Sequence, residues 1–250
     1  MENLNTSNSS CIAPRKTKSV MLDILIALAP ATVAAIVLFG LKAAVIIAVC
    51  VGSALLSEYV FNLLAKKEQT VGDLTAVVTG LLLALNLSTN VTIWQCLVGS
   101  VFAIVIVKCA FGGLGYNIVN PAIAARVMLL IAFNEVAGGA QTVFAEIASG
   151  ATPLAILGGA EGTLPSMLDM LIGNRGGAIG ETCAIALLIG GIYLIVRKVI
   201  TWHIPVVYIG GVFLLSLAFG GDVMGAVYHT LGGGLIIGAI FMATDPVTSP

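Results

Sequence analysis

Two long, nearly uncharged apolar runs constrain this chain more than any other feature of its sequence. Residues 21–40 contain one charged side chain, Asp23, and residues 43–64 contain one, Glu58. About 20 apolar residues in a helix cross the ~30 Å hydrocarbon core of a bilayer. Because backbone polar groups in lipid must be satisfied within the segment, each run is predicted to be a transmembrane helix.

The composition of the whole chain excludes a soluble domain. Hydrophobic residues make up 59% of its 250 residues and charged residues 9%, against roughly 25% charged in soluble domains. Membrane lipid is therefore an expected partner, and nucleic acid is not. The five cysteines form no CxxC pair and no Cys/His cluster, so no metal site made by this chain alone is expected. A single cysteine of this chain as one ligand of an iron–sulfur cluster that is shared with another subunit remains an alternative.

The hydropathy pattern predicts an all-α polytopic membrane protein, with a tail at 1–20 and one transmembrane domain at 21–250. Several spans are short or interrupted by Gly and Pro, which is typical of broken helices beside a site. The eight predicted spans are residues 21–40, 43–64, 72–88, 91–109, 118–133, 180–196, 205–220 and 226–243.

Lysine and arginine predict the orientation, because they concentrate in cytoplasmic segments. With the N-terminus in the cytoplasm, Lys42 and Arg175 fall outside, Arg126 falls within a span, and the other eight cations fall inside. These eight are Arg15, Lys16, Lys18, Lys66, Lys67, Lys108, Arg197 and Lys198. The long segment 134–177 then faces outward.

Two glycine-rich runs indicate an internal repeat. One precedes Asn117 and the other precedes Thr244, and each leads into a polar break that contains proline. The first unit has five spans and the second has three, so an inverted repeat would need two further spans after Pro250. The complete fold is then expected to have ten helices, and the chain is expected to stop before its natural C-terminus.

The first candidate site lies in the outward segment, at Ser149, Gly150, Ala151, Thr152 and Pro153. Thr152 can cap a helix whose first residue is proline. A group esterified to its hydroxyl would lie at a helix N-terminus, where phosphate is favoured. The alternative is a capped helix in an ordinary loop.

The second candidate site runs from Gly112 to Arg126 and contains Asn117 and Asn120. Three glycines and a proline at the mouth of a span predict a broken or re-entrant helix. A mid-membrane arginine costs at least ~2.5 kcal/mol, so Arg126 needs a partner or a polar ligand. The alternative is a close-packed glycine loop with Arg126 in a structural ion pair.

Three carboxylates, Asp73, Glu181 and Asp245, lie near the predicted span ends. They are candidates for a cation path, because carboxylates at a membrane boundary can attract and desolvate a cation. The alternative is that they are solvated at helix ends.

Several of these stretches together resemble the NqrB/RnfD family. SGAT at 149–152 is similar to the family's flavinylation motif, although Glu146 replaces its usual aspartate. The segment from Gly112 to Arg126 resembles the family signature GGLGxNxxNPAxxAR. Further similar segments are 71–87, Gly180-Glu181-Thr182-Cys183 with cysteine in place of serine, and 232–247.

The resemblance implies a subunit of an Rnf ferredoxin:NAD⁺ oxidoreductase that moves Na⁺ or H⁺ across a bacterial or archaeal cytoplasmic (inner) membrane. It implies covalent FMN on Thr152, attached by a flavin transferase, and a second flavin, riboflavin, within the bundle. Asn117, Asn120 and Arg126 would line the inner flavin or ion cavity. The expected partners are Rnf subunits A, B, C, E and G, and the chain is not catalytic alone.

Two alternatives remain. The short N-terminal extension and the modest loop favour Rnf over an NqrB-like component of a Na⁺-translocating NADH:quinone reductase. A flavin-free secondary transporter or channel would also have broken helices, a repeat and a midplane charge.

Overall fold

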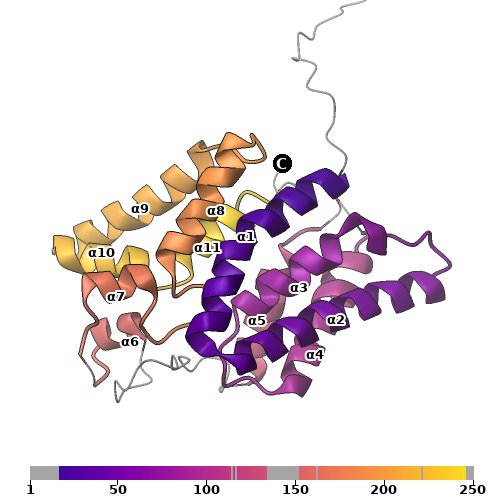
Figure 1. Cartoon of the computed structure of the whole chain (residues 1–250), viewed down its shortest axis with the longest axis horizontal. Helices are drawn as coiled ribbons and strands as arrows, with labels where there is room; N and C mark the ends of the chain where they lie inside the picture. Colours follow the sequence, from indigo (N-terminus) through magenta and orange to yellow (C-terminus); the bar gives the residue numbers. More distant parts are fainter. Residues whose placement is uncertain are drawn as a thin grey trace, which may run out of the picture.

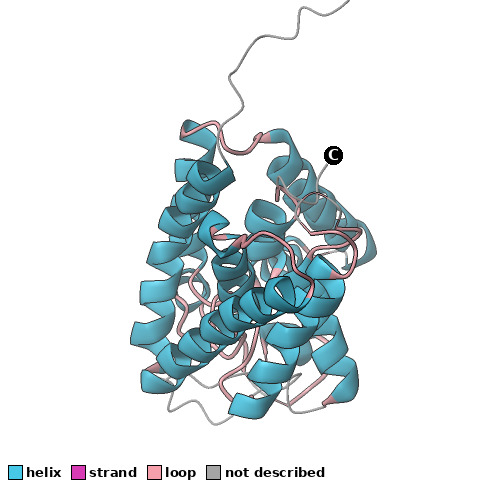
Figure 2. Ribbon diagram, turned by 90° about the vertical axis from the view of Figure 1, so that its right-hand side faces the viewer, coloured by secondary structure: helices cyan, strands magenta, loops and turns pink. Residues whose placement is uncertain are grey.

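The computed structural model describes residues 17–113, 115, 117–133, 152–161, 163–220 and 222–245. These residues form helices joined by loops, and none of them belongs to a β-strand (Figures 1 and 2). The predicted all-α class is therefore confirmed for the part of the chain that the structure describes.

The helices are of three kinds, namely α-helices, a short 3₁₀ turn (η1) and two π-helical stretches (η2 and η4). In chain order they are α1 (Thr17–Phe39), α2 (Leu41–Leu64), η1 (Val71–Asp73), α3 (Thr75–Leu85), α4 (Ile93–Val101), η2 (Phe102–Cys109), α5 (Pro121–Ala132), α6 (Pro153–Leu157), α7 (Met167–Ile172), α8 (Ala184–Val196), α9 (His203–Gly220), α10 (Val223–Leu231), α11 (Leu235–Ile237) and η4 (Gly238–Met242).

All eight predicted apolar segments are helical, but they differ in length. Helices α1, α2 and α9 are long and apolar enough to cross a membrane. Helix α10 and the segment Leu235–Met242 form a fourth candidate span that is bent by 63° at its break. Helices α3, α5 and α8 have 11, 12 and 13 residues. They rise about 16–20 Å, less than the hydrocarbon thickness. The count of eight full spans is therefore not established, and the eighth predicted span, 226–243, is broken at glycines 232–234 instead of running as one helix.

The side chains on the surface of the helix bundle are those of a membrane protein. Helix α9 has a single buried residue, Pro205, and its Val207 and Phe219 are 72% and 89% exposed. A helix that is apolar all round and packs so little against its own chain requires lipid or protein around it. Together with the long apolar helices, this shows a multi-pass membrane protein.

Helices α1 and α8 pack side by side and antiparallel (Figure 1). Near the start of α1, Asp23 accepts hydrogen bonds from Tyr193 and Arg197 at the end of α8, both at 3.1 Å. Farther along the pair, Gly190 lies against the backbone carbonyl of Ala27. Small residues allow this close approach of helices in membranes.

The order of elements recurs in the two halves of the chain. Long helix α2 packs on short α3 and on η2, and long helix α9 packs on short α10 and on η4. Each π-helical stretch is followed by a polar segment, which contains Asn117 in one half and Asp245 in the other. Since α1 and α8 begin these two series and run antiparallel, the arrangement supports the predicted inverted repeat.

The structure differs from the expectation at the start of the first helix and within the predicted outward loop. Helix α1 begins at Thr17, four residues inside the predicted tail, because helical structure continues from the apolar span back through Val20 and Lys18. The predicted outward loop 134–177 contains helices α6 and α7. Its first part, 134–151, lies outside the described residues.

We expect Gly190→Ala to destabilise the protein by about 1–3 kcal/mol, because the added methyl would overlap the Ala27 carbonyl. Gly210→Ala in α9 is the matched control, since nothing lies within 4 Å of its added Cβ. Thermal unfolding of both variants in detergent is the measurement. Equal transition temperatures would contradict the close α1–α8 contact.

Candidate functional site

Thr152 begins helix α6 as predicted. Its backbone is extended (φ −70°, ψ 153°), Pro153 is the first helical residue, and the Thr152 Oγ1 accepts a hydrogen bond from the Ala155 N–H at 3.2 Å. The preceding Ser149, Gly150 and Ala151 lie outside the described residues. The structure thus confirms the capped, proline-initiated helix, which is common to both interpretations of the motif.

A buried polar centre forms around Arg126 on α5. Its Nη1 donates a hydrogen bond to the Oδ1 of Asn86, at the C-terminal end of α3, over 2.8 Å. The Asn86 Nδ2 donates to the Leu82 carbonyl at 2.7 Å and lies 3.9 Å from the Met242 sulfur. Arg126 therefore has the polar partner that its depth in the membrane requires.

Glu181 reaches the same centre from the turn before α8. A Cβ placed on Gly234 would lie 3.2 Å from the Arg126 Nη1 and 3.0 Å from the Glu181 Oε2. The Glu181 Oε1 accepts from the Ala178 N–H at 2.9 Å, while Oε2 is buried without a hydrogen-bond partner among the described residues. Glu181 is 6% exposed, so it is not a solvated residue at a helix end.

Arg175 holds the backbone turn that carries Glu181. Its Nη2 donates to the Glu181 carbonyl at 2.8 Å and its Nε to the Thr182 carbonyl at 3.4 Å. Burial lowers the pKa of the Arg175 guanidinium, and the nearby Glu181 carboxylate opposes that shift. The sequence placed Arg175 among the charges of an outer loop, whereas the structure shows a buried side chain that organises the turn.

Asn117, Asn120 and Asp245 gather at a second place, where the two polar breaks of the repeat meet. The Asn120 Oδ1 caps α5 by accepting from the Ala122 N–H at 3.0 Å, and its Nδ2 donates to the Asp245 Oδ2 at 3.3 Å. All three residues line a cavity of about 20 Å³, which can hold one water molecule. The Asn117 Oδ1 is buried without a partner in the described part of the chain.

The structure does not bring all the predicted residues together. Arg126 and Glu181 share the Gly234 centre, and Asn117, Asn120 and Asp245 share the small cavity. Asp73 is half-buried in η1 and is not among the residues that line this cavity.

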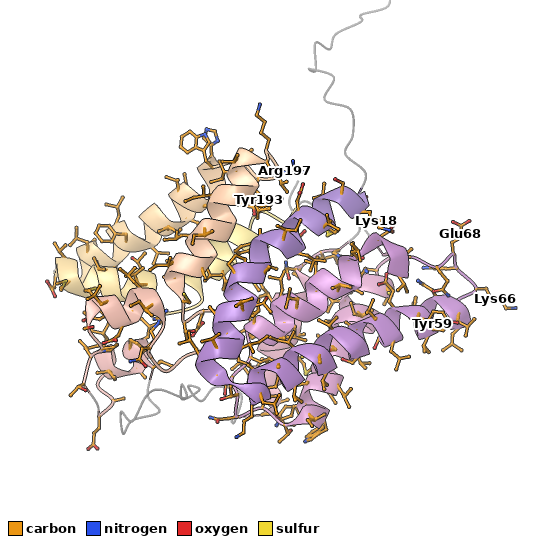
Figure 3. The ribbon with its side chains drawn as sticks, viewed as in Figure 1. Lys18, Tyr59, Lys66, Glu68, Tyr193 and Arg197 are labelled. Carbon is orange, nitrogen blue, oxygen red and sulfur yellow. The ribbon has the colours of Figure 1, made fainter. Side chains whose placement is uncertain are left out.

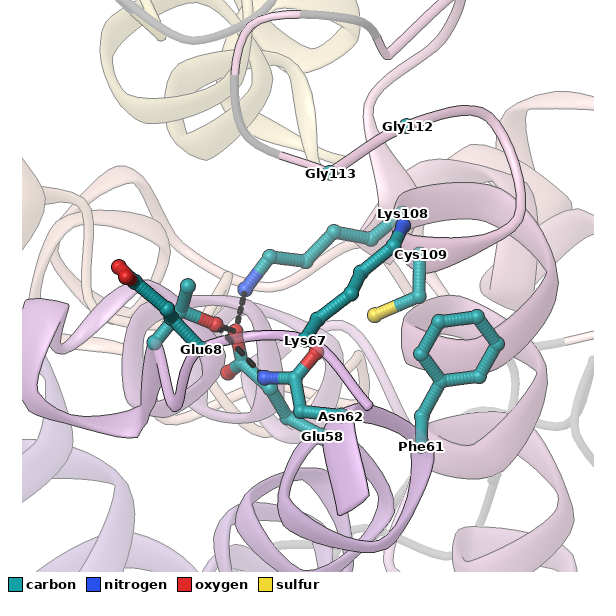
Figure 4. Close-up of a pocket in the computed structure, with 10 residues that line it drawn as sticks. Glu58, Phe61, Asn62, Lys67, Glu68, Lys108, Cys109, Gly112 and Gly113 are labelled. Atoms are coloured by element: carbon teal, nitrogen blue, oxygen red, sulfur yellow. Dashed lines mark hydrogen bonds and ion pairs between the residues drawn. The ribbon is translucent and has the colours of Figure 1, made fainter. Parts of the chain in front are cut away.

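A third polar group, around Glu58 and Lys108, escaped the sequence analysis (Figure 4). The Lys108 Nζ donates to the Glu58 Oε1 and to the Thr75 Oγ1, each at 2.7 Å. Thr70 also donates to the Glu58 Oε1, and Asn62 donates to the Thr70 Oγ1. This network lines a cavity of about 220 Å³ between α2, the end of η2 and the loop glycines 112 and 113.

Lys108, which the sequence analysis counted among the cations on the cytoplasmic side, has a side chain that is 4% exposed and paired inside the bundle. The residue lies in the π-helical η2, whose wider turn changes the direction of its side chains. A signal was present in the sequence, since Glu58 is the one charge in an apolar span and intramembrane charges are usually paired.

Lys108 and Thr75 also line the small Asn120–Asp245 cavity. Lys108 therefore lines both cavities.

We expect Glu58→Leu to destabilise the protein by about 3–5 kcal/mol, because it leaves the Lys108 ammonium buried and unpaired. The double variant Glu58→Leu/Lys108→Met should recover most of this loss, since well-packed apolar residues often replace a buried ion pair without cost. Thermal unfolding in detergent compares the two. A double variant no more stable than the single would contradict the pairing.

Comparisons with known proteins agree with this architecture. A family model described as the NQR2, RnfD, RnfE family matches residues 5–250. The D subunit of the Na⁺-translocating ferredoxin:NAD⁺ oxidoreductase complex of Acetobacterium woodii is 46% identical over 253 residues, which cover 99% of this chain and 79% of that protein.

Two further relatives show the breadth of the similarity. The D subunit of the proton-translocating ferredoxin:NAD⁺ oxidoreductase complex of Clostridium ljungdahlii is 40% identical, over 92% of this chain and 75% of that protein. The B subunit of the Na⁺-translocating NADH-quinone reductase of Azotobacter vinelandii is 36% identical, over 69% of this chain and 46% of that protein. This chain belongs to the NQR2, RnfD, RnfE family.

Proposed function

We propose that this chain is the D subunit of an ion-translocating ferredoxin:NAD⁺ oxidoreductase (Rnf) complex. The observation that carries the proposal is the extent of the match. Relatives named as D subunits of such complexes align over 92–99% of the chain, whereas the quinone-reductase B subunit of A. vinelandii aligns over 69%. The NqrB-like alternative is thereby the less favoured one. Membership of the family also disfavours a flavin-free transporter or channel.

We further propose that Thr152 carries FMN through a phosphoester on its Oγ1. The residues present fit such a group, since the hydroxyl is half-exposed at the start of a short helix and already accepts from the Ala155 N–H. An ester oxygen can still accept that hydrogen bond. When bound, the flavin supplies the one- and two-electron chemistry, while this chain holds it in place and sets its surroundings.

Asn117, Asn120 and Arg126 are proposed to lie beside the inner flavin, riboflavin. A cavity of about 20 Å³ is too small for a flavin ring, which needs a pocket on the order of 300 Å³ or more. Binding there would therefore require the residues that line this cavity to move apart. The Arg126 guanidinium would be suited to stabilise an anionic reduced flavin.

The proposed orientation places the N-terminus in the cytoplasm and α6 and α7 outside the cytoplasmic membrane. Lys18 precedes most of α1, Lys66 and Lys67 follow α2, and Arg197 with Lys198 follows α8, which puts these charges at the same side of an alternating bundle (Figure 3). Lys108 no longer counts because it is buried, yet the excess of cations on this side persists.

Glu181 and Asp245 are the proposed ion-path carboxylates with the clearest structural support, and Asp73 stays a candidate at η1. A carboxylate serves either Na⁺ or H⁺. The proposed partners are Rnf subunits A, B, C, E and G together with the flavin transferase that attaches FMN. Relatives are named for each ion, so the proposal covers both.

We expect Thr152→Ala to abolish a fluorescent flavin band that migrates with this chain on a denaturing gel. Ser166→Ala is the matched control, because Ser166 caps α7 through its hydroxyl as Thr152 caps α6. The chain is produced in cells that contain the flavin transferase. An unflavinylated wild-type chain, or a band that survives Thr152→Ala, would refute the assignment.

We expect Arg126→Leu to slow electron transfer through the complex severalfold while the covalent flavin band remains. The change leaves the Asn86 Oδ1 without its donor and removes the guanidinium that lies beside Gly234 together with the Glu181 carboxylate. Lys42→Leu, which removes an exposed charge at the start of α2, is the control. Ferredoxin-dependent NAD⁺ reduction by membrane vesicles measures both, and unchanged turnover in Arg126→Leu would remove Arg126 from the site.

A further inference from the structure

The break between α10 and α11 consists of Gly232, Gly233 and Gly234, and side chains from three other segments fill the space beside it. A Cβ on Gly232 would lie 3.3 Å from the Leu154 Cδ2, and a Cβ on Gly233 would lie 2.9 Å from the Leu154 Cδ1. The third glycine faces Arg126 and Glu181. Leu154 thus occupies the volume that a side chain at Gly233 would take, whereas a Cβ on Gly232 would meet the Tyr228 carbonyl first and Leu154 second.

Leu154 lies two residues after Thr152, in the first turn of α6. That helix has five residues, which is far below the length at which an isolated helix is stable in water. The position of Thr152 therefore depends on tertiary contacts rather than on the helix itself. Pro153 is buried and Leu154 is half-buried, whereas Ala155 is exposed.

A second contact ties the same outer segment to α10. The Tyr228 hydroxyl donates to the Pro165 carbonyl at 2.7 Å, just before α7. Both α6 and the segment before α7 thus contact the broken span.

We propose that Leu154 is a positioning residue, which holds Thr152 at a fixed place beside the glycine break by packing into the space left by Gly232 and Gly233. This inference rests on the proposed function, because what it positions is the flavin on Thr152. Glycine at 233 follows from the same contact, since a larger residue there would displace Leu154. Leu154 then lies against Gly233, and the next residue, Gly234, faces the Arg126–Glu181 centre.

The test measures how freely the covalent flavin moves. We expect the fluorescence anisotropy of the flavin on the full, flavinylated chain to fall in Leu154→Ala and in Gly233→Val, and the flavin band on a denaturing gel to persist. Leu154→Met should restore wild-type anisotropy, because methionine fills a similar volume. Gly233→Val lies outside the attachment segment, so it tests the contact even if Leu154→Ala impairs attachment.

Two matched controls separate this effect from general loosening. Ile156→Ala alters a half-buried residue of the same helix, and Gly238→Val adds a side chain where nothing lies within 4 Å of the new Cβ. Both should keep wild-type anisotropy. Wild-type anisotropy in Leu154→Ala and Gly233→Val, or an equal fall in Ile156→Ala, would overturn the positioning role. A wild-type chain without any flavin band would instead overturn the proposed function, and the positioning of a flavin with it.

Discussion

Pairing of charges inside a hydrocarbon environment is the constraint on which the rest of this structure depends. A lone charge in the bilayer is costly, and the cost falls when the charge acquires a partner or hydrogen bonds. The chain meets this requirement at three places that join distant segments. Asp23 pairs with Arg197, Glu58 pairs with Lys108, and Arg126 binds Asn86 beside Glu181. These contacts connect α1 to α8, α2 to η2, and α3 to α5 and the turn before α8.

Helix breaks are the second constraint, and they locate the polar groups of the site. Glycine at 232–234 lets Leu154, Arg126 and Glu181 approach one bent span. From there a series of contacts continues through Asn86 and Met242 to the Asn120–Asp245 cavity. Lys108 lines both this cavity and the larger one beside Glu58. The polar groups thus follow one another from the proposed flavin-bearing helix to the end of η2, in a bundle whose outer side chains are apolar.

This arrangement is consistent with the proposed role in an electron-transferring complex. The chain would hold one flavin at a short helix that has little stability of its own, and it keeps a half-buried guanidinium and a buried carboxylate next to the same break. The Glu181 Oε2 has no hydrogen-bond partner among the described residues, and burial makes such an atom costly.

The sequence by itself determined the class of the protein, its eight apolar helical segments and the capped start of α6. Each of these follows from local patterns such as apolar length, Gly and Pro placement, and Thr before Pro. Only the tertiary structure decided which charges meet. It turned Lys108 inward to Glu58, made Arg175 a buried support of a turn, and placed Leu154 on Gly233. No local pattern could supply these results, because they depend on segments separated by many residues and brought together by helix packing. Full span lengths also escaped the sequence, since hydropathy marks an apolar segment but not where its helix ends.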